Sequence, residues 1–273
     1  MTDVVLVTAV AVALAAAARS TWSPCGRSML STLTPVGERG RGHRFGATAA
    51  WFVAGGILGG LCLGALGAGL AAAVAAAGPS SQVTTAVALG LLLVGTALDA
   101  ELGGVALPIH RRQVNERWLD RYRNGIYGLG FGWQIGVGLA TYIMTAGVYL
   151  VPLLGALTGR PWEALALGGL FGAVRGLAVL GGRSLRTPAA LADFHRRLDA
   201  LGRRSQRAMV AVEAAGAAAV AGVLWPPAAA VAVAGVAVAG AVALRRRHAA
   251  PTTRPVAAPV APVEWSPAPD PAG

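Results

Sequence analysis

The segment TWSPCGRSMLSTLTP, residues 21–35, places a thiol, a proline and a guanidinium group directly after a long apolar run. A cation next to a cysteine favours the reactive thiolate form of the side chain, and Arg27 follows Cys25 by two positions. The same guanidinium group is equally suited to binding an anion. Cys25 is therefore the candidate catalytic residue, and the residues leave open whether Arg27 activates it or binds an anion.

Pro24 decides how this thiol is positioned. Proline removes a backbone hydrogen-bond donor, so we expect the helix to break near Ser23. The stretch from Val4 to Pro35 is also too long for one straight membrane crossing. Irregular backbone at membrane depth persists only where protein or a water-filled cavity surrounds it. The sequence therefore predicts an internal cavity at the break, lined by Pro24, Cys25 and Arg27.

Further ionisable residues lie within or at the ends of apolar stretches, namely Arg19, Asp99, Arg175 and Glu213. Charged side chains in a membrane are costly and usually mark a pathway or a paired site. We expect Arg175 to line the cavity and to pair with Glu213 or Asp99. The alternative is that Arg19 and Arg175 extend to a membrane interface. The histidines lie in arginine-rich segments without metal-ligand spacing, so neither a metal site nor a cofactor is predicted.

The composition indicates which elements carry these residues. The chain is 55% hydrophobic and 13% charged, whereas soluble domains are about 45–50% apolar and about 25% charged. A membrane core about 30 Å thick needs about 20 apolar residues in a helix. We predict an all-α, polytopic membrane helix bundle with about seven transmembrane helices in residues 1–248, and a disordered, proline-rich cytoplasmic tail in residues 249–273. The predicted spans are about 4–35 (broken), 47–77, 83–108, 126–153, 162–182, 208–225 and 227–244.

The arginines fall in alternate loops between these spans, while the intervening loops hold only Arg160. The positive-inside rule then predicts a cell (inner or plasma) membrane protein with its N-terminus outside and its C-terminus in the cytoplasm. This distribution accounts for the net charge of +11 without a nucleic-acid partner. The expected partners are the lipid bilayer and its anionic headgroups.

Small residues recur at four-residue spacing within several predicted spans. Such ridges let helix backbones approach closely, which supplies packing where no hydrophobic force acts between helices in lipid. The ridges are Gly56, Gly60 and Gly64; Gly128, Gly132 and Gly136; and Gly168, Gly172 and Gly176. We interpret most of these glycines as packing residues.

The motif SPCG, followed by a basic loop and AAWFVAGGILGG, resembles the CcdA/DsbD family of membrane thiol–disulfide carriers, part of the wider LysE-type transporter group. The resemblance implies two inverted repeats of three helices each, followed here by one extra C-terminal helix. It also implies a site near the bilayer midplane formed by discontinuous helices.

The family carries a second motif in its fourth helix, which GFGWQIGVGLATYI resembles. Gly132 and Trp133 match it, whereas Gln134, Ile135 and Gly136 stand where the family has threonine, proline and cysteine. The resemblance places Trp133, Gln134 and Gly136 at the cavity. It also shows that the second motif cysteine is missing.

Three functions remain open. The first is a transporter-like protein that handles a small anionic or zwitterionic solute at a midplane cavity. The second is a thiol–disulfide carrier of the cytochrome c biogenesis type, acting through Cys25 with Cys62 or with a partner such as a thioredoxin-like protein. Such a carrier needs two sulfur atoms that can come into contact. Cys62 lies in the segment GGLCLG, where a cysteine behaves as a small packing residue. The third is a non-catalytic membrane assembly factor. The missing cysteine favours the transporter over an enzyme.

Overall fold

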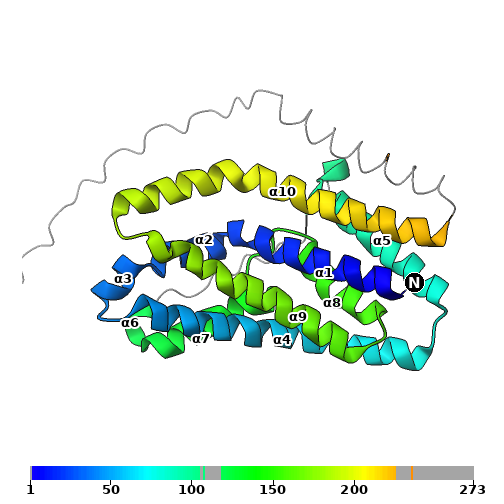
Figure 1. Ribbon diagram of the computed structural model, residues 1–273, viewed down its shortest axis with the longest axis horizontal. Helices are drawn as coiled ribbons and strands as arrows, with labels where there is room; N and C mark the ends of the chain where they lie inside the picture. Colours follow the sequence, from blue (N-terminus) through cyan, green and yellow to red (C-terminus); the bar gives the residue numbers. More distant parts are fainter. Residues whose placement is uncertain (1, 105–106, 108–117, 226–234, 236–273) are drawn as a thin grey trace, which may run out of the picture.

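The computed structural model describes residues 2–104, 107, 118–225 and 235, and all regular elements in these residues are helices (Figure 1). The all-α class is therefore confirmed. The predicted span 227–244 and the tail 249–273 lie outside the described residues, apart from Gly235. The α-helices are α1 Thr2–Arg19, α2 Pro24–Thr32, α3 Pro35–Gly40, α4 Phe45–Ala77, α5 Ser81–Asp99, α6 Trp118–Arg121, α7 Asn124–Val137, α8 Gly147–Leu157, α9 Pro161–Leu177 and α10 Pro188–Leu224.

Several of these helices are long and apolar enough to cross a membrane. Within the described residues there are 5 such segments: Asp3–Trp22, Phe45–Ala77, Ser81–Asp99, Pro161–Ser184 and Pro188–Leu224. A helix needs about 17–25 apolar residues to cross the hydrocarbon core. Their length and composition support the membrane location expected from the sequence.

The first span is interrupted before Pro24. Helix α1 ends at Arg19 and a 3-10 turn, Ser20–Trp22, follows it. The Ser23 hydroxyl then accepts a hydrogen bond from the Gly26 backbone N–H at 3.1 Å, which caps α2 with Pro24 in its first turn. Proline and a serine cap are the residues that favour the start of a helix, so the local sequence explains the interruption.

A second interruption divides the segment 126–153, which the sequence predicts as one span. Helix α7 ends at Val137, residues 138–146 are not helical, and α8 begins at Gly147. Gly138 has a φ of 72°, a conformation that glycine adopts without strain. The Asp99 carboxylate accepts a hydrogen bond from the Ala146 N–H at 2.7 Å and satisfies the backbone at the start of α8.

Helix α4 lies between α7 and α9, and its backbone is in close contact with both. A Cβ atom on Gly136 of α7 or on Gly172 of α9 would lie 2.1 Å from the carbonyl oxygen of Gly56. A Cβ atom on Gly60 would lie 2.3 Å from the Gly168 oxygen. The packing role predicted for these glycines is confirmed, because only glycine fits at these contacts.

The remaining helices complete the bundle on the other side of α9. Helix α1 contacts α8, α9 and α10, and α10 also packs along α5 (Figure 1). One buried apolar cluster is formed by α1, α5, α8, α9 and α10. A second cluster joins α2, α4 and α7 and includes Cys25 and Phe52. The interruption before α2 lies where these two parts of the bundle meet.

Candidate functional site: a buried arginine beside the interrupted first helix

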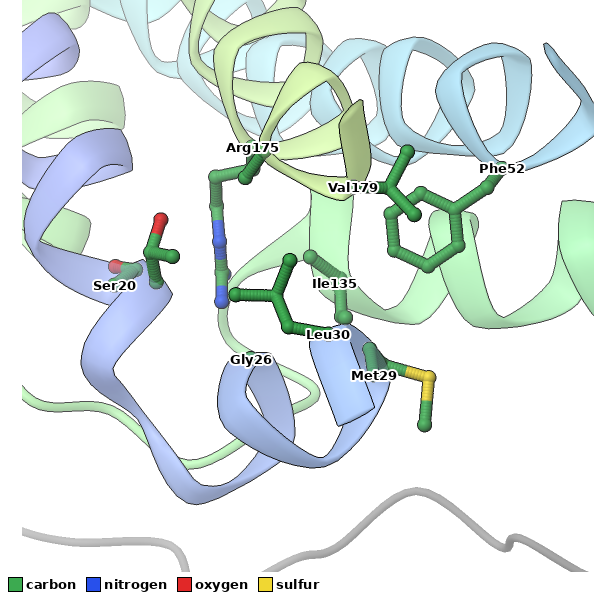
Figure 2. Close-up of a pocket in the computed structure, with 10 residues that line it drawn as sticks. Ser20, Gly26, Met29, Leu30, Phe52, Ile135, Arg175 and Val179 are labelled. Atoms are coloured by element: carbon green, nitrogen blue, oxygen red, sulfur yellow. The ribbon is translucent and has the colours of Figure 1, made fainter. Parts of the chain in front are cut away.

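A small cavity lies between the interruption of the first span and helix α9 (Figure 2). It offers about 20 Å³ to the centre of a water-sized molecule, and a buried water needs about 10–15 Å³ on this measure. In this conformation the cavity therefore has room for one or two waters or a very small ion. It is lined by Ser20, Thr21, Gly26, Met29, Leu30, Phe52, Ile135, Arg175, Ala178 and Val179.

Among the described residues that line this cavity, Arg175 is the only charged one. Figure 2 shows its side chain extending from α9 toward α2, between Ser20 and Leu30. The residue is 4% exposed, and its guanidinium carbon lies 5.6 Å from the centroid of the Phe171 ring. Among the residues that the structure describes, no carboxylate forms an ion pair with it. A buried cation without a counter-charge is costly, so the cavity is suited to a negatively charged group.

Cys25 lies on the same side of the bundle. It is 2% exposed, sits in the first turn of α2 and interacts electrostatically with Arg175. The first turn of a helix carries partial positive charge from its backbone N–H groups. Arg175 and the start of α2 therefore both favour an anion beside Cys25.

Gly26 makes this arrangement sterically feasible. A Cβ atom at this position would lie 2.5 Å from the Thr21 carbonyl oxygen, because the chain folds back tightly after the 3-10 turn. Any other residue would push α2 away from the end of α1. Gly26, Ser20 and Thr21 are cavity residues that the sequence did not predict, although their position beside Pro24 was a usable signal.

Two residues predicted at the cavity lie elsewhere. Pro24 is exposed at the start of α2. Arg27 forms an ion pair with Asp199 of α10, with 2.7 Å between Nη1 and Oδ1 and exposed side-chain fractions of 41% and 57%. Arg27 turns outward because a partially solvated carboxylate is available on α10, whereas the cavity holds none.

The α7 residues also take positions other than those expected from the resemblance. Trp133 is 42% exposed and Gln134 is partly exposed, and neither lines the cavity. Gly136 is buried against the backbone of Gly56, so it packs α7 against α4 and does not face the cavity. Their neighbour Ile135 is the residue of this motif that reaches the cavity.

The two cysteines lie in different environments. Cys25 is buried in the apolar cluster of α2, α4 and α7, whereas Cys62 is exposed on α4. A cysteine side chain at Gly136 would collide with the α4 backbone. The structure thus brings no second thiol of this chain to Cys25.

Asp99 belongs to a second cavity, which has about 200 Å³ available to water-sized molecules. Its carboxylate accepts hydrogen bonds from the Thr145 hydroxyl and the Ala146 N–H, and it does not pair with Arg175. Arg19 reaches the same cavity and donates hydrogen bonds to Ser205 and to the Gly202 carbonyl. The cavity is lined by Arg19, Leu98, Asp99, Glu101, Leu107, Tyr142, Ile143, Met144 and Gln206.

Glu213 lies in the interior of the bundle, on α10. It is 0% exposed, and neither carboxyl oxygen has a hydrogen-bond partner among the described residues. It faces Gly95 of α5, where an added Cβ atom would lie 3.2 Å from Oε1. The expected pairing with Arg175 is therefore not formed. Among the described residues, no group of three or more histidine, cysteine or acidic residues is arranged to hold a metal ion.

Comparison with known proteins identifies relatives of part of the chain. No family model matches, and no solved structure matches. The chain is 34% identical over 169 residues to the methylamine utilization protein MauF of Paracoccus versutus, covering 59% of each chain. It is 35% identical over 178 residues to MauF of Paracoccus denitrificans, covering 62% of this chain and 61% of the relative. A third MauF, from Methylophilus methylotrophus, is 30% identical over 168 residues.

The matches cover a little under two thirds of each protein, so this chain spans only 59% and 61% of the length of the first two relatives. The resemblance to the CcdA/DsbD family continues to rest on its motif residues. Over the matched part, the chain is a distant homologue of the methylamine utilization protein MauF.

Proposed function

We propose that this chain is a multi-pass membrane protein that acts in methylamine utilization and binds a small anion, or the carboxylate of a small zwitterion, beside Arg175. The role in methylamine utilization is taken from the MauF relatives. The binding chemistry is taken from one observation, the buried Arg175 guanidinium that faces a cavity without a carboxylate partner among the described residues.

The surroundings of Arg175 support an anion rather than a cation. The first turn of α2 contributes partial positive charge, and Ser20 and Thr21 contribute polar groups at the cavity wall. The cavity is small, so a solute larger than a single small ion enters only when the segment around the interruption moves. The interruption permits such a movement, because the 3-10 turn connects two separate helices rather than a continuous one.

The two interruptions support an architecture of discontinuous helices. The predicted first and fourth spans are both interrupted, one at Ser23 and the other in residues 138–146. Inverted-repeat transporters place such helices in corresponding positions of their two halves. The proposal therefore includes two inverted three-helix repeats, with the N-terminus outside, the C-terminus in the cytoplasm and the basic segments against anionic lipid headgroups.

Binding to the purified full-length protein in lipid nanodiscs tests the proposal. Chloride, formate, acetate and glycine are added in turn, and thermal unfolding is followed. A ligand at 100 times its dissociation constant stabilises the folded state by about 2.7 kcal/mol. We expect at least one of these solutes to raise the unfolding temperature of the natural protein, and Arg175→Gln to abolish the increase.

Arg160→Gln is the matched control, because Arg160 is an exposed arginine paired with Glu163 at 2.7 Å. This variant should retain the stabilisation. If no solute stabilises the natural protein, or if Arg175→Gln responds equally, the anion site does not exist and the assembly-factor function is favoured. Growth on methylamine, compared between a deletion strain and strains carrying each variant, tests the cellular role.

Thiol chemistry at Cys25 is the second candidate, favoured by the electrostatic interaction between Cys25 and Arg175. The partner thiol would have to come from another protein such as a thioredoxin-like protein, because Cys62 is exposed elsewhere on α4 and Gly136 has no room for a side chain. Trapping of a mixed disulfide distinguishes this function. The Cys62→Ser protein should form the adduct and the Cys25→Ser protein should not. Absence of any adduct through Cys25 would remove this candidate.

A further inference from the structure

Glu213 is a buried acid that neither the fold nor the anion site uses. It lies at 0% exposure on α10 and both of its carboxyl oxygens lack a hydrogen-bond partner among the described residues. An ionised carboxylate without donors is strongly unfavourable in an apolar interior, whereas the neutral acid is tolerated. Ionisable residues in this position within a membrane bundle usually belong to an ion or proton pathway.

The space around Glu213 excludes most ligands. Gly95 of α5 lies so close that an added Cβ atom would be 3.2 Å from Oε1 and 2.8 Å from the Leu150 side chain. A metal ion or an organic ammonium ion would need several further oxygen ligands or additional volume. A proton needs neither, so it is the cation that fits at this carboxyl group.

Asp99 links Glu213 to the second cavity, which has room for water molecules. It lies four residues after Gly95 on α5, one helical turn or about 6 Å along the axis. Among the described residues it is the charged group that interacts electrostatically with Glu213. Asp99 itself lines the cavity of about 200 Å³ together with Arg19, Glu101 and Gln206.

The two carboxyl groups have opposite surroundings. Asp99 accepts hydrogen bonds from Thr145 and from the Ala146 N–H, and the charge of Arg19 acts on it, so these contacts offset part of the cost of burying its carboxylate. Glu213 receives no such bond. Leu150 of α8 lies beside Gly95, the residue that Glu213 faces, and Thr8 of α1 packs against Gly216, one turn after Glu213 on α10. Two neighbouring acids whose surroundings differ in this way are suited to act as proton donor and acceptor.

We propose that Glu213 is a proton-binding site that exchanges its proton with the Asp99 cavity. The O–H bond of the Glu213 acid breaks, its electron pair stays on the carboxylate, and the proton passes to the Asp99 carboxylate or to water in the cavity. Protonation follows the reverse path. The site does not depend on the anion site at Arg175; if both exist, the proton compensates the charge of the bound anion.

Infrared difference spectroscopy of the full-length protein in nanodiscs, between pH 5 and pH 10, tests the proposal. We expect a protonated-carboxyl band in the natural protein that disappears as the pH rises and is absent from Glu213→Gln. Glu213→Gln keeps the shape of the neutral acid and should fold. Glu163→Gln is the control, because Glu163 is also buried but is paired with Arg160, and this variant should keep the Glu213 band.

The outcomes separate this inference from the proposed function. A band that persists through the whole pH range, or one that is equal in the natural protein and in Glu213→Gln, would overturn proton exchange at Glu213. Arg175→Gln should lose anion stabilisation and keep the band. Asp99→Asn should slow the band's response to a pH jump by at least tenfold; an unchanged rate would overturn the route through Asp99.

Discussion

A Cβ atom on Gly136 of α7 would lie 2.1 Å from the carbonyl oxygen of Gly56 on α4. Position 136 is where the resemblance to the CcdA/DsbD family would place a second motif cysteine. Gly172 of α9 approaches the same oxygen from another helix, again with 2.1 Å to an added Cβ atom. The backbone of α4 is thus enclosed by two glycine ridges, and position 136 has no room for a cysteine side chain.

Gly136→Cys should therefore fail to provide a second cysteine that pairs with Cys25. The new side chain forces α7 away from α4, and overpacking of this kind costs about 1–3 kcal/mol or more. Thermal unfolding of the purified variant should show a clear decrease in the midpoint temperature. Gly69→Cys is the control, since Gly69 lies on α4 with no atom within 4 Å of an added Cβ. Equal stability of the two variants would show that α7 and α4 are not packed as described.

A buried network around Glu38 connects α3, α4 and α7. The Glu38 carboxylate is 0% exposed and accepts hydrogen bonds from the Tyr127 hydroxyl at 2.7 Å, from Arg41 at 3.0 Å and from Thr48. Tyr127→Phe should lower the free energy of unfolding by about 1.5–3 kcal/mol, because it removes a hydrogen bond to a buried charged group. Denaturant unfolding in detergent measures this change. Tyr122→Phe, at a tyrosine that is 41% exposed, should have no comparable effect.

The start of α8 depends on a contact from a distant part of the chain. The Thr145 hydroxyl donates to Asp99 and accepts from the Gly147 N–H at 3.1 Å, in the manner of a helix cap. Thr145→Val should cost about 1 kcal/mol, which increases local opening about fivefold. Hydrogen exchange measured by mass spectrometry should show faster exchange at residues 146–150. Thr158→Val, at the other end of α8, should leave those amides unchanged.

Arg27 should be dispensable for anion binding. Its ion pair with Asp199 joins two partly exposed side chains, and such pairs contribute about 0–1 kcal/mol. Arg27→Ala should therefore unfold near the natural temperature and retain the stabilisation by small anions that Arg175→Gln loses. Loss of that stabilisation in Arg27→Ala would indicate that Arg27 reaches the cavity in another conformation.

Local chemistry in the sequence accounts for part of the fold. A helix must stop before Pro24 because proline lacks a backbone donor and Ser23 is a good cap, and the first span is interrupted there. Apolar length likewise identifies helices that suit a membrane. The four-residue spacing of Gly56, Gly60 and Gly64 indicates a packing ridge. These features depend on neighbouring residues, so they can be read along one chain.

The candidate site was less accessible from the sequence, because its geometry depends on contacts between distant segments. The interruption after Gly138 required Asp99, which lies 47 residues before Ala146. Arg27 was predicted at the cavity because it follows Cys25 by two positions. In the structure Arg27 pairs with Asp199 of α10, and Arg175 of α9 faces the cavity instead.

The sequence by itself determined which segments form apolar helices, where the first helix breaks and which charged residues lie within the apolar segments. These features follow from local backbone chemistry and from the free energy of transferring side chains to lipid. Only the tertiary structure decided which charges are paired. Arg175 and Glu213 are both buried without an ion-pair partner among the described residues, since α9 and α10 direct them into different parts of the bundle.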